Sequence, residues 1–220
     1  MPTEVDIGAL CGASRRRLSS LVRDTGDDGC RLRAVAACPG WSVHDTIAHL
    51  LGVVEDGLAG LLSGPPDEAM TAREVSRHRD HSVEEMVMAW ERLAPMFETV
   101  LTERQIWPAM LDVISHEHDV RAALGTPGAR DDSAVLLGAR RLAELDTTRV
   151  VITVEEFSDI ASPRCPSAEA TLTAPAFEIL RFRLGRRSVG QVLDLPWIGD
   201  PRPHLPALFV FGPASHSLIE

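Results

Sequence analysis

The sequence predicts a mainly α-helical protein: an N-terminal four-helix bundle followed by a smaller C-terminal domain of mixed α and β structure. Three observations support this fold class. Four long segments with apolar residues at helical spacing precede residue 125, a turn-rich stretch covers residues 125–132, and a β-branched run at residues 150–154 follows it. We therefore predict two domains, residues 1–128 and 129–220.

The first two predicted helices are defined by their apolar stripes and by one clear start signal. The first covers about residues 5–23. The second begins at Ser42, which serves as N-cap, with Asp45 three residues later in a variant of the capping box. Its apolar stripe continues through Leu61 and Leu62, so we expect the helix to end at the Gly-Pro-Pro turn that follows.

The third and fourth helices are predicted from similar signals. Ser82 and Glu85 form a full capping box at the start of the third helix, and the fourth covers about residues 106–124 before a glycine. Helices of this length predict an antiparallel bundle. The charged segment at residues 73–81 contains two histidines but no apolar periodicity, and we interpret it as a mobile loop.

The C-terminal domain begins with a predicted helix and continues into short strands. We expect a helix over residues 133–145, strands over 150–154 and 170–173, and a short helix over 176–184 that Pro175 opens. The apolar tail, residues 205–212, fits either a strand or a buried helix.

The charge of the chain excludes several classes of partner. The formal net charge is −10, and the longest basic run is Arg15-Arg16-Arg17. Nucleic-acid binding requires a basic face that releases counterions, and an anionic membrane surface attracts the same kind of face. We therefore expect neither a nucleic acid nor a membrane as partner.

The N-terminus and the cysteines predict a cytoplasmic protein. The first residues lack the basic and apolar regions of a signal peptide, and no apolar run reaches the length of a membrane span. The four cysteines show no CxxC and no paired spacing, so we interpret them as reduced thiols (Cys11, Cys30, Cys38 and Cys165).

The sharpest chemical signal is a carboxylate and an imidazole four residues apart in the fourth helix. At about 100° per residue, Asp112 and His116 lie near 200° and 240° when the apolar stripe is placed around zero. Both side chains therefore point away from the main hydrophobic contact and lie close enough together to hold one metal ion. An Asp and a His at this spacing also occur as an ordinary surface pair, and this alternative stays open here.

His49 in the second helix is the third candidate ligand. It lies almost opposite the apolar stripe of its helix, on a face with several small residues. If that face meets Asp112 and His116, two imidazoles and one carboxylate complete a site with a free coordination position, as in catalytic zinc sites. His118 lies on the apolar side of its helix, which favours a buried position or a role in supporting a ligand over direct binding of the metal.

Two segments resemble signatures of a known family. Residues 38–50, CPGWSVHDTIAHL, resemble the CPGW(S/T)VxD…AHL signature of the mycothiol-dependent maleylpyruvate isomerase family. Residues 112–125, DVISHEHDVRAALG, resemble its second signature, (E/D)xxxHxxDxxxALG. Residues 184–188 and 199–201 also resemble C-terminal segments of members of this family. The resemblance therefore extends over essentially the whole chain.

The resemblance implies a DinB-like four-helix bundle that binds a metal near one end. Carried over by position, the ligands are His49, Asp112 and His116; the characterised isomerase type has Glu where this chain has Asp112, which has a shorter reach. The C-terminal part resembles a small domain related to sterol-carrier proteins, in which Arg186 and Arg187 are the first positions to consider for binding an anion of the substrate.

The resulting hypothesis is a thiol-dependent isomerase or transferase. A divalent metal, expected to be zinc, binds mycothiol as its thiolate. The thiolate adds to the double bond of a small electrophile such as maleylpyruvate, rotation about the resulting single bond follows, and elimination of the thiolate releases the isomer. Asp119 or Asp56 is expected to orient a ligand imidazole. Metal-assisted hydrolysis through a bound water, and a non-enzymatic small-molecule binding protein, are the alternatives.

Overall fold

The computed structural model describes residues 5–62, 67–145, 149–157 and 167–220, and the chain divides into two compact units. The helical unit is Met1–Pro127 and the mixed unit is Gly128–Glu220. The predicted fold class is confirmed, because the first unit is helical and the second combines helices with a small sheet. Cys165 lies outside the described residues.

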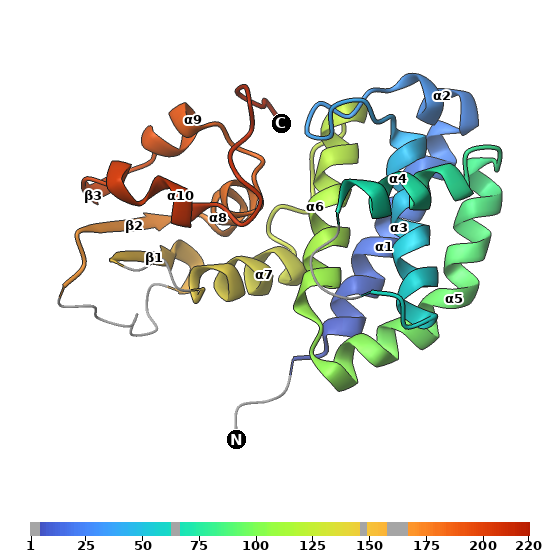
Figure 1. Ribbon diagram of the computed structural model, residues 1–220, viewed down its shortest axis with the longest axis horizontal. Helices are drawn as coiled ribbons and strands as arrows, with labels where there is room; N and C mark the ends of the chain where they lie inside the picture. The colour runs from blue at the N-terminus through green and yellow to red at the C-terminus, as the bar shows by residue number, and fades with distance from the viewer. Residues whose placement is uncertain (1–4, 63–66, 146–148, 158–166) are drawn as a thin grey trace. The chain divides into compact units, whose positions relative to one another are not determined.

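Four long helices and two short ones build the described part of the helical unit (Figure 1). The long helices are α1 (Ile7–Thr25), α3 (Val43–Leu58), α5 (Val83–Arg104) and α6 (Trp107–Leu124). The short helices are α2 (Asp27–Leu32) and α4 (Glu68–Arg77).

Both predicted capping boxes are present. The Ser42 hydroxyl accepts from the backbone N–H of Asp45, whose carboxylate accepts from the Ser42 N–H at 2.8 Å; Ser82 and Glu85 repeat this arrangement at the start of α5. These reciprocal bonds satisfy N–H groups that the first turn of a helix leaves without partners, which is why both helices begin where the sequence predicts.

The predicted end of α3 is wrong. The helix ends at Leu58, and Gly60 adopts a left-handed conformation with a φ of 71°. Such a residue terminates a helix, since it turns the chain out of the helical path. Leu61 and Leu62, which the apolar stripe was expected to bury, are 61% and 39% exposed.

The bundle is also not fully antiparallel. In Figure 1, α1 and α6 run in one direction, whereas α3 and α5 both run in the other. The chain returns between α3 and α5 through a segment that contains α4, which crosses α3. The interpretation of residues 73–81 as a loop is therefore wrong for most of the segment. Apolar periodicity does not reveal α4, because the only residue that this helix buries is Glu74.

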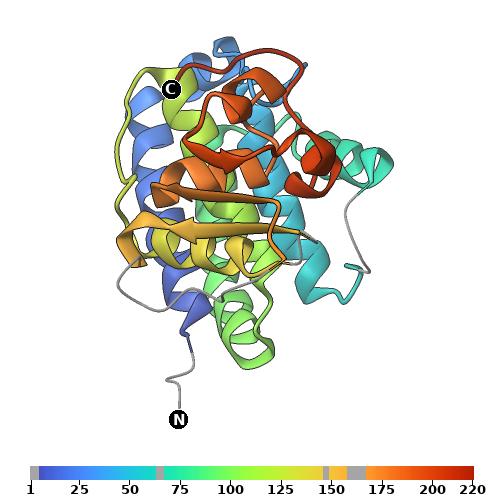
Figure 2. The same cartoon turned by 90° about the vertical axis from the view of Figure 1, so that its left-hand side faces the viewer.

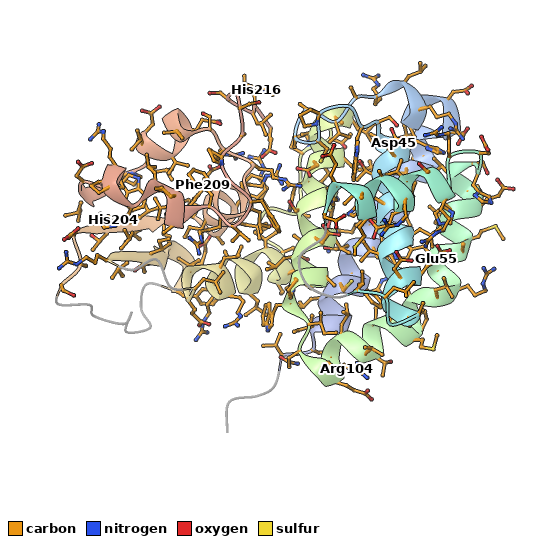
Figure 3. The ribbon with its side chains drawn as sticks, in the orientation of Figure 1. Asp45, Glu55, Arg104, His204, Phe209 and His216 are labelled. Atoms are coloured by element: carbon orange, nitrogen blue, oxygen red, sulfur yellow. The ribbon has the colours of Figure 1, made fainter. Side chains whose placement is uncertain are left out.

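α4 is held against α3 by close packing and by ion pairs. At Gly52 the two helices approach so closely that an added Cβ would lie 2.6 Å from the Cβ of Glu74. Arg77 donates to Glu55 and to Asp56, at 2.8 Å and 2.7 Å, and Nε2 of His78 lies 2.9 Å from Glu55. Glu55 is labelled on α3 in Figure 3.

The interior of the bundle is mainly apolar, and buried polar side chains lie at several places in it. All four long helices contribute buried residues, including Ile7, Leu18, Val22, Ile47, Leu50, Leu51, Met86, Trp90, Leu101, Met110 and Ile114. One polar group joins α1 to α6: the fully buried Glu117 accepts two hydrogen bonds from Arg17, both 2.8 Å, and one from Arg121. A second polar group is the candidate site.

The mixed unit contains a three-stranded sheet in the order β1-β2-β3. β1 (Val150–Val154) and β2 (Ala170–Ala174) pair in parallel, side by side in Figure 2, and β3 (Trp197–Gly199) pairs with β2 in the antiparallel sense. Its helices are α7 (Ser133–Ala143), α8 (Ala176–Arg183), α9 (Val189–Leu193) and α10 (Leu205–Leu208). The first two strands and α8 confirm the sequence prediction, and the ambiguous tail begins as the short helix α10.

No helix among the described residues combines the length and the apolar character needed to cross a membrane.

Candidate metal centre

Two helices bring the three predicted ligands together. His49 projects from α3, and Asp112 and His116 project from adjacent turns of α6. Nε2 of His49 lies 3.4 Å from Oδ2 of Asp112, and Nε2 of His116 lies 3.4 Å from Oδ1 of the same carboxylate. One potential ligand atom from each of the three residues lies within 4.8 Å of the others. The surface-pair alternative does not describe His116, which is 5% exposed.

Each imidazole has a buried carboxylate on its other nitrogen. Oε2 of Glu74 lies 2.7 Å from Nδ1 of His49, and Oδ2 of Asp119 lies 3.0 Å from Nδ1 of His116. A carboxylate at Nδ1 favours a proton on that nitrogen and leaves the Nε2 lone pair for a metal. Both rings are therefore held in the orientation in which Nε2 faces Asp112.

The residues that were expected to support the ligands lie in different places. Asp119 lies at Nδ1 of His116, where an orienting carboxylate was expected. The carboxylate of Asp56 accepts from Arg77, and the carboxylate at Nδ1 of His49 is that of Glu74. His118 is buried, as its place on the apolar side of α6 predicts.

The three candidate ligands strongly influence one another's ionisation. Burial by itself raises the pKa of Asp112, but the adjacent imidazoles of His49 and His116 outweigh it and hold the pKa well below its ordinary value. Burial lowers the pKa of His49 and of His116, yet the charge of Asp112 and the hydrogen bonds to Asp112 and to the carboxylate at each Nδ1 together outweigh this effect, so that both pKa values are raised. The centre thus combines a carboxylate that remains ionised with two imidazoles whose protonated forms that carboxylate stabilises.

The residues fit a divalent metal ion of the zinc type. With bonds of about 2.0–2.1 Å, a tetrahedral ion separates its ligand atoms by about 3.3–3.4 Å, which is close to the two separations of 3.4 Å. Oδ2 of Asp112 is buried and accepts no hydrogen bond from the described residues. A buried carboxylate oxygen without a donor is costly, and a cation removes that cost.

Trp41 and Cys38, which precede α3, also belong to the site. The Trp41 ring lies 5.1 Å from the His49 ring and stacks at 24° on the His116 ring, with centroids 6.1 Å apart. Sγ of Cys38 lies 3.9 Å from Nδ1 of His116. Sequence reasoning did not assign a role to Trp41 or to Glu74. The CPGW segment next to the α3 cap was the available signal for Trp41, whereas a single Glu in a charged segment gave none.

The two predicted anion-binding arginines are engaged within the mixed unit. Arg187 donates to Glu178 through Nε and Nη2, both at 2.8 Å, and to Glu220 at 2.9 Å. Two carboxylates therefore lie against this guanidinium, and the binding of a substrate anion by Arg187 stays a prediction. Arg186 donates to the Leu184 carbonyl at 2.8 Å.

Two comparisons with known proteins give a match. The family model of the mycothiol maleylpyruvate isomerase N-terminal domain matches residues 11–145, which is more than half of the chain. A crystal structure of the mycothiol-dependent maleylpyruvate isomerase, in a histidine-to-alanine mutant form, is similar in fold. The TM-score is 0.51 at 15% identity, covering 82% of this chain and 87% of that one. No curated protein matches the sequence.

Proposed function

We propose a function that proceeds from one premise: the chain belongs to the mycothiol maleylpyruvate isomerase N-terminal domain family, and is an enzyme of that family. In the proposal, His49, Asp112 and His116 hold a divalent metal ion, with zinc as the expected metal. The cosubstrate is a low-molecular-weight thiol, mycothiol by family, and the substrate is a small electrophile of the maleylpyruvate class. The reaction is thiol-dependent isomerisation, or conjugation with related electrophiles.

One observation carries the proposal: one ligand atom from each of His49, Asp112 and His116 lies within 4.8 Å of the others, and a buried carboxylate lies at Nδ1 of each imidazole. Three protein ligands leave a coordination position for an exogenous group. A metal of this type supplies Lewis acidity, which converts a thiol into a thiolate near neutral pH.

The remaining residues of the site have positioning roles. Glu74 and Asp119 keep the Nδ1 protons in place, so that His49 and His116 present lone pairs at Nε2. The indole of Trp41 covers one side of both rings and limits their rotation. Asp112, with its side chain 30% exposed, is the ligand nearest to solvent and marks the side from which thiol and electrophile enter.

Metal content tests the ligand assignment. Wild-type protein is expected to bind the first equivalent of zinc tightly at this centre, and His49→Ala and His116→Ala are expected to bind zinc at least tenfold more weakly. His216→Ala, at an exposed position of the mixed unit, is the matched control and should bind zinc like wild type. Equal zinc affinity in all four proteins would remove the metal centre from the proposal.

Turnover tests the chemistry. The zinc-loaded protein is incubated with maleylpyruvate, with and without mycothiol, and the isomer is measured by its ultraviolet spectrum. We expect isomerisation only when the thiol is present, and loss of activity in His49→Ala. Conversion without thiol would indicate metal-assisted hydrolysis or another thiol-independent reaction. If the zinc-loaded protein converted no electrophile at all, the remaining interpretation would be a small-molecule binding protein without catalytic activity.

A further inference from the structure

A second set of donor atoms lies behind His116, on the side that faces away from Asp112. Sγ of Cys38 is 3.9 Å from Nδ1 of His116 and 3.7 Å from Oδ2 of Asp119, and this oxygen is 3.0 Å from Nδ1. Thiol, imidazole and carboxylate therefore form a triangle of potential ligand atoms. Two of these residues come from α6, and Cys38 comes from the segment before α3.

The size of this triangle matches the coordination sphere of one metal ion. Bonds of about 2.3 Å to sulfur and about 2.0 Å to nitrogen or oxygen give tetrahedral ligand separations of about 3.3–3.6 Å. The three observed separations, 3.0, 3.7 and 3.9 Å, lie on both sides of this range. A movement of a few tenths of an ångström would bring the three atoms around a common ion.

We propose that Cys38, His116 and Asp119 form a second cation site, selective for thiophilic divalent ions, that shares His116 with the first site. In the doubly loaded protein His116 bridges the two ions, with Nε2 toward the first and Nδ1 toward the second. The inference goes beyond the proposed function, because it concerns a different set of ligands and requires no turnover.

Charge balance favours a cation at this place. Oδ2 of Asp119, whose side chain is fully buried, faces two donors, the Cys38 thiol and Nδ1 of His116. A divalent ion that replaces the two protons of these donors leaves the net charge of the buried group unchanged: two protons depart to solvent and two positive charges arrive. Metal binding to Cys and His is coupled to such a release of protons.

The position of Cys38 provides access and selectivity. Cys38 is half-buried, whereas the described cysteines Cys11 and Cys30 are buried and belong to no cluster of three ligand residues. A thiolate favours zinc, cadmium or cobalt over magnesium or calcium. Because both ions share the His116 ring, an ion at Nδ1 withdraws electron density from Nε2. We therefore expect that zinc in excess of one equivalent, by filling the second site, reduces the affinity of the first site for its ion.

Cobalt provides the test, since a thiolate ligand gives Co²⁺ an intense charge-transfer band in the near ultraviolet. Metal-free protein carrying Cys165→Ser is titrated with Co²⁺ alone. We expect the first equivalent to produce only visible ligand-field bands and the second to add the charge-transfer band. Cys38→Ser should lose that band and keep the ligand-field bands of the first equivalent, and Cys30→Ala is the matched control that retains both.

Two results would overturn the second site. One is the absence of a charge-transfer band at two or more equivalents of Co²⁺, and the other is a band that persists in Cys38→Ser. A charge-transfer band complete at one equivalent would also contradict it, because Cys38 would then be a ligand of a single ion.

A second measurement uses the protein with Cys38 in place, so that its result does not depend on whether the Cys38 variant folds. Cys38 is alkylated with iodoacetamide at increasing Cd²⁺, and the modified peptide is quantified by mass spectrometry. We expect at least tenfold protection at two equivalents, and unchanged alkylation would count against the site. In His49→Ala the charge-transfer band should remain although the first ion is lost, so failure of thiol-dependent turnover is distinguishable from failure of this inference.

Discussion

Oε2 of Glu74 lies 2.7 Å from Nδ1 of His49, and both side chains are almost completely removed from solvent. Glu74 belongs to α4 and His49 to α3, and apolar periodicity in the sequence does not predict that α4 packs against α3. A carboxylate placed in this way fixes the tautomer of an imidazole and increases its basicity toward a metal. The properties of the candidate centre therefore depend on how α4 is docked.

Removal of the Glu74 charge should weaken metal binding. Glu74→Gln keeps the size of the side chain but loses the anion that holds the Nδ1 proton, and we expect zinc affinity to fall about 10–100-fold. Competition with a chromophoric chelator measures this change. Glu68→Gln, at the exposed start of the same helix, is the control. Equal affinities in the two variants would show that Glu74 does not support His49.

Gly52 should tolerate no side chain. A Cβ at this position would lie 2.6 Å from the Cβ of Glu74 and 3.1 Å from its Cα, so α4 must shift. Overpacking of this kind costs about 1–3 kcal/mol, more than the roughly 1 kcal/mol that alanine gains over glycine in a helix. We expect Gly52→Ala to lower both the free energy of unfolding in urea and zinc affinity. At Gly190 the nearest atom is 3.8 Å away, and Gly190→Ala should lower neither.

Glu55 should make the docking of α4 depend on pH. Burial raises the pKa of this carboxyl, but the hydrogen bonds from Arg77 and His78 outweigh it, and the net pKa in the folded protein is lowered. Its contribution is therefore complete above the unfolded pKa of about 4.3 and is lost as the pH falls through the folded value. Glu55 is partly exposed, so we expect Glu55→Gln to cost about 1 kcal/mol or less at pH 7.

This prediction is checked by urea unfolding of wild type and Glu55→Gln between pH 7 and pH 3. The two curves of stability against pH should converge at the acidic end. A difference that is constant over the whole range would mean that the ionised form of Glu55 contributes nothing. Glu68→Gln is again the matched control, because it lies on the exposed first turn of α4.

Glu117 should be the most sensitive charge of the bundle outside the candidate centre. Its carboxylate is fully buried and binds Arg17 and Arg121, which joins α1 to α6. Replacement of one member of a buried ion group leaves the others without compensation, and we expect Glu117→Gln to lower the free energy of unfolding by about 3 kcal/mol. Glu91→Gln breaks an exposed pair with Arg23 and should cost less than about 1 kcal/mol. Similar losses in both variants would contradict this ranking.

Local signals in the sequence were sufficient to predict the helices that begin with a cap and to select the candidate ligands. Ser42 and Ser82 start α3 and α5 where predicted, because a capping box involves only four consecutive residues. The spacing of Asp112 and His116 in one helix also follows from sequence, since 3.6 residues per turn place positions four apart on one face.

The tertiary structure decided what those ligands meet. The sequence by itself determined the fold class, the two capped helices and the three candidate ligands His49, Asp112 and His116. Only the folded chain turns α3 and α5 in the same direction, brings Glu74 to His49 through the close approach at Gly52, and pairs Asp56 with Arg77 and Arg187 with Glu178. The physical reason is range: caps and periodicity act within a few residues, whereas these contacts depend on the path of the chain between helices, which the spacing of residues does not encode.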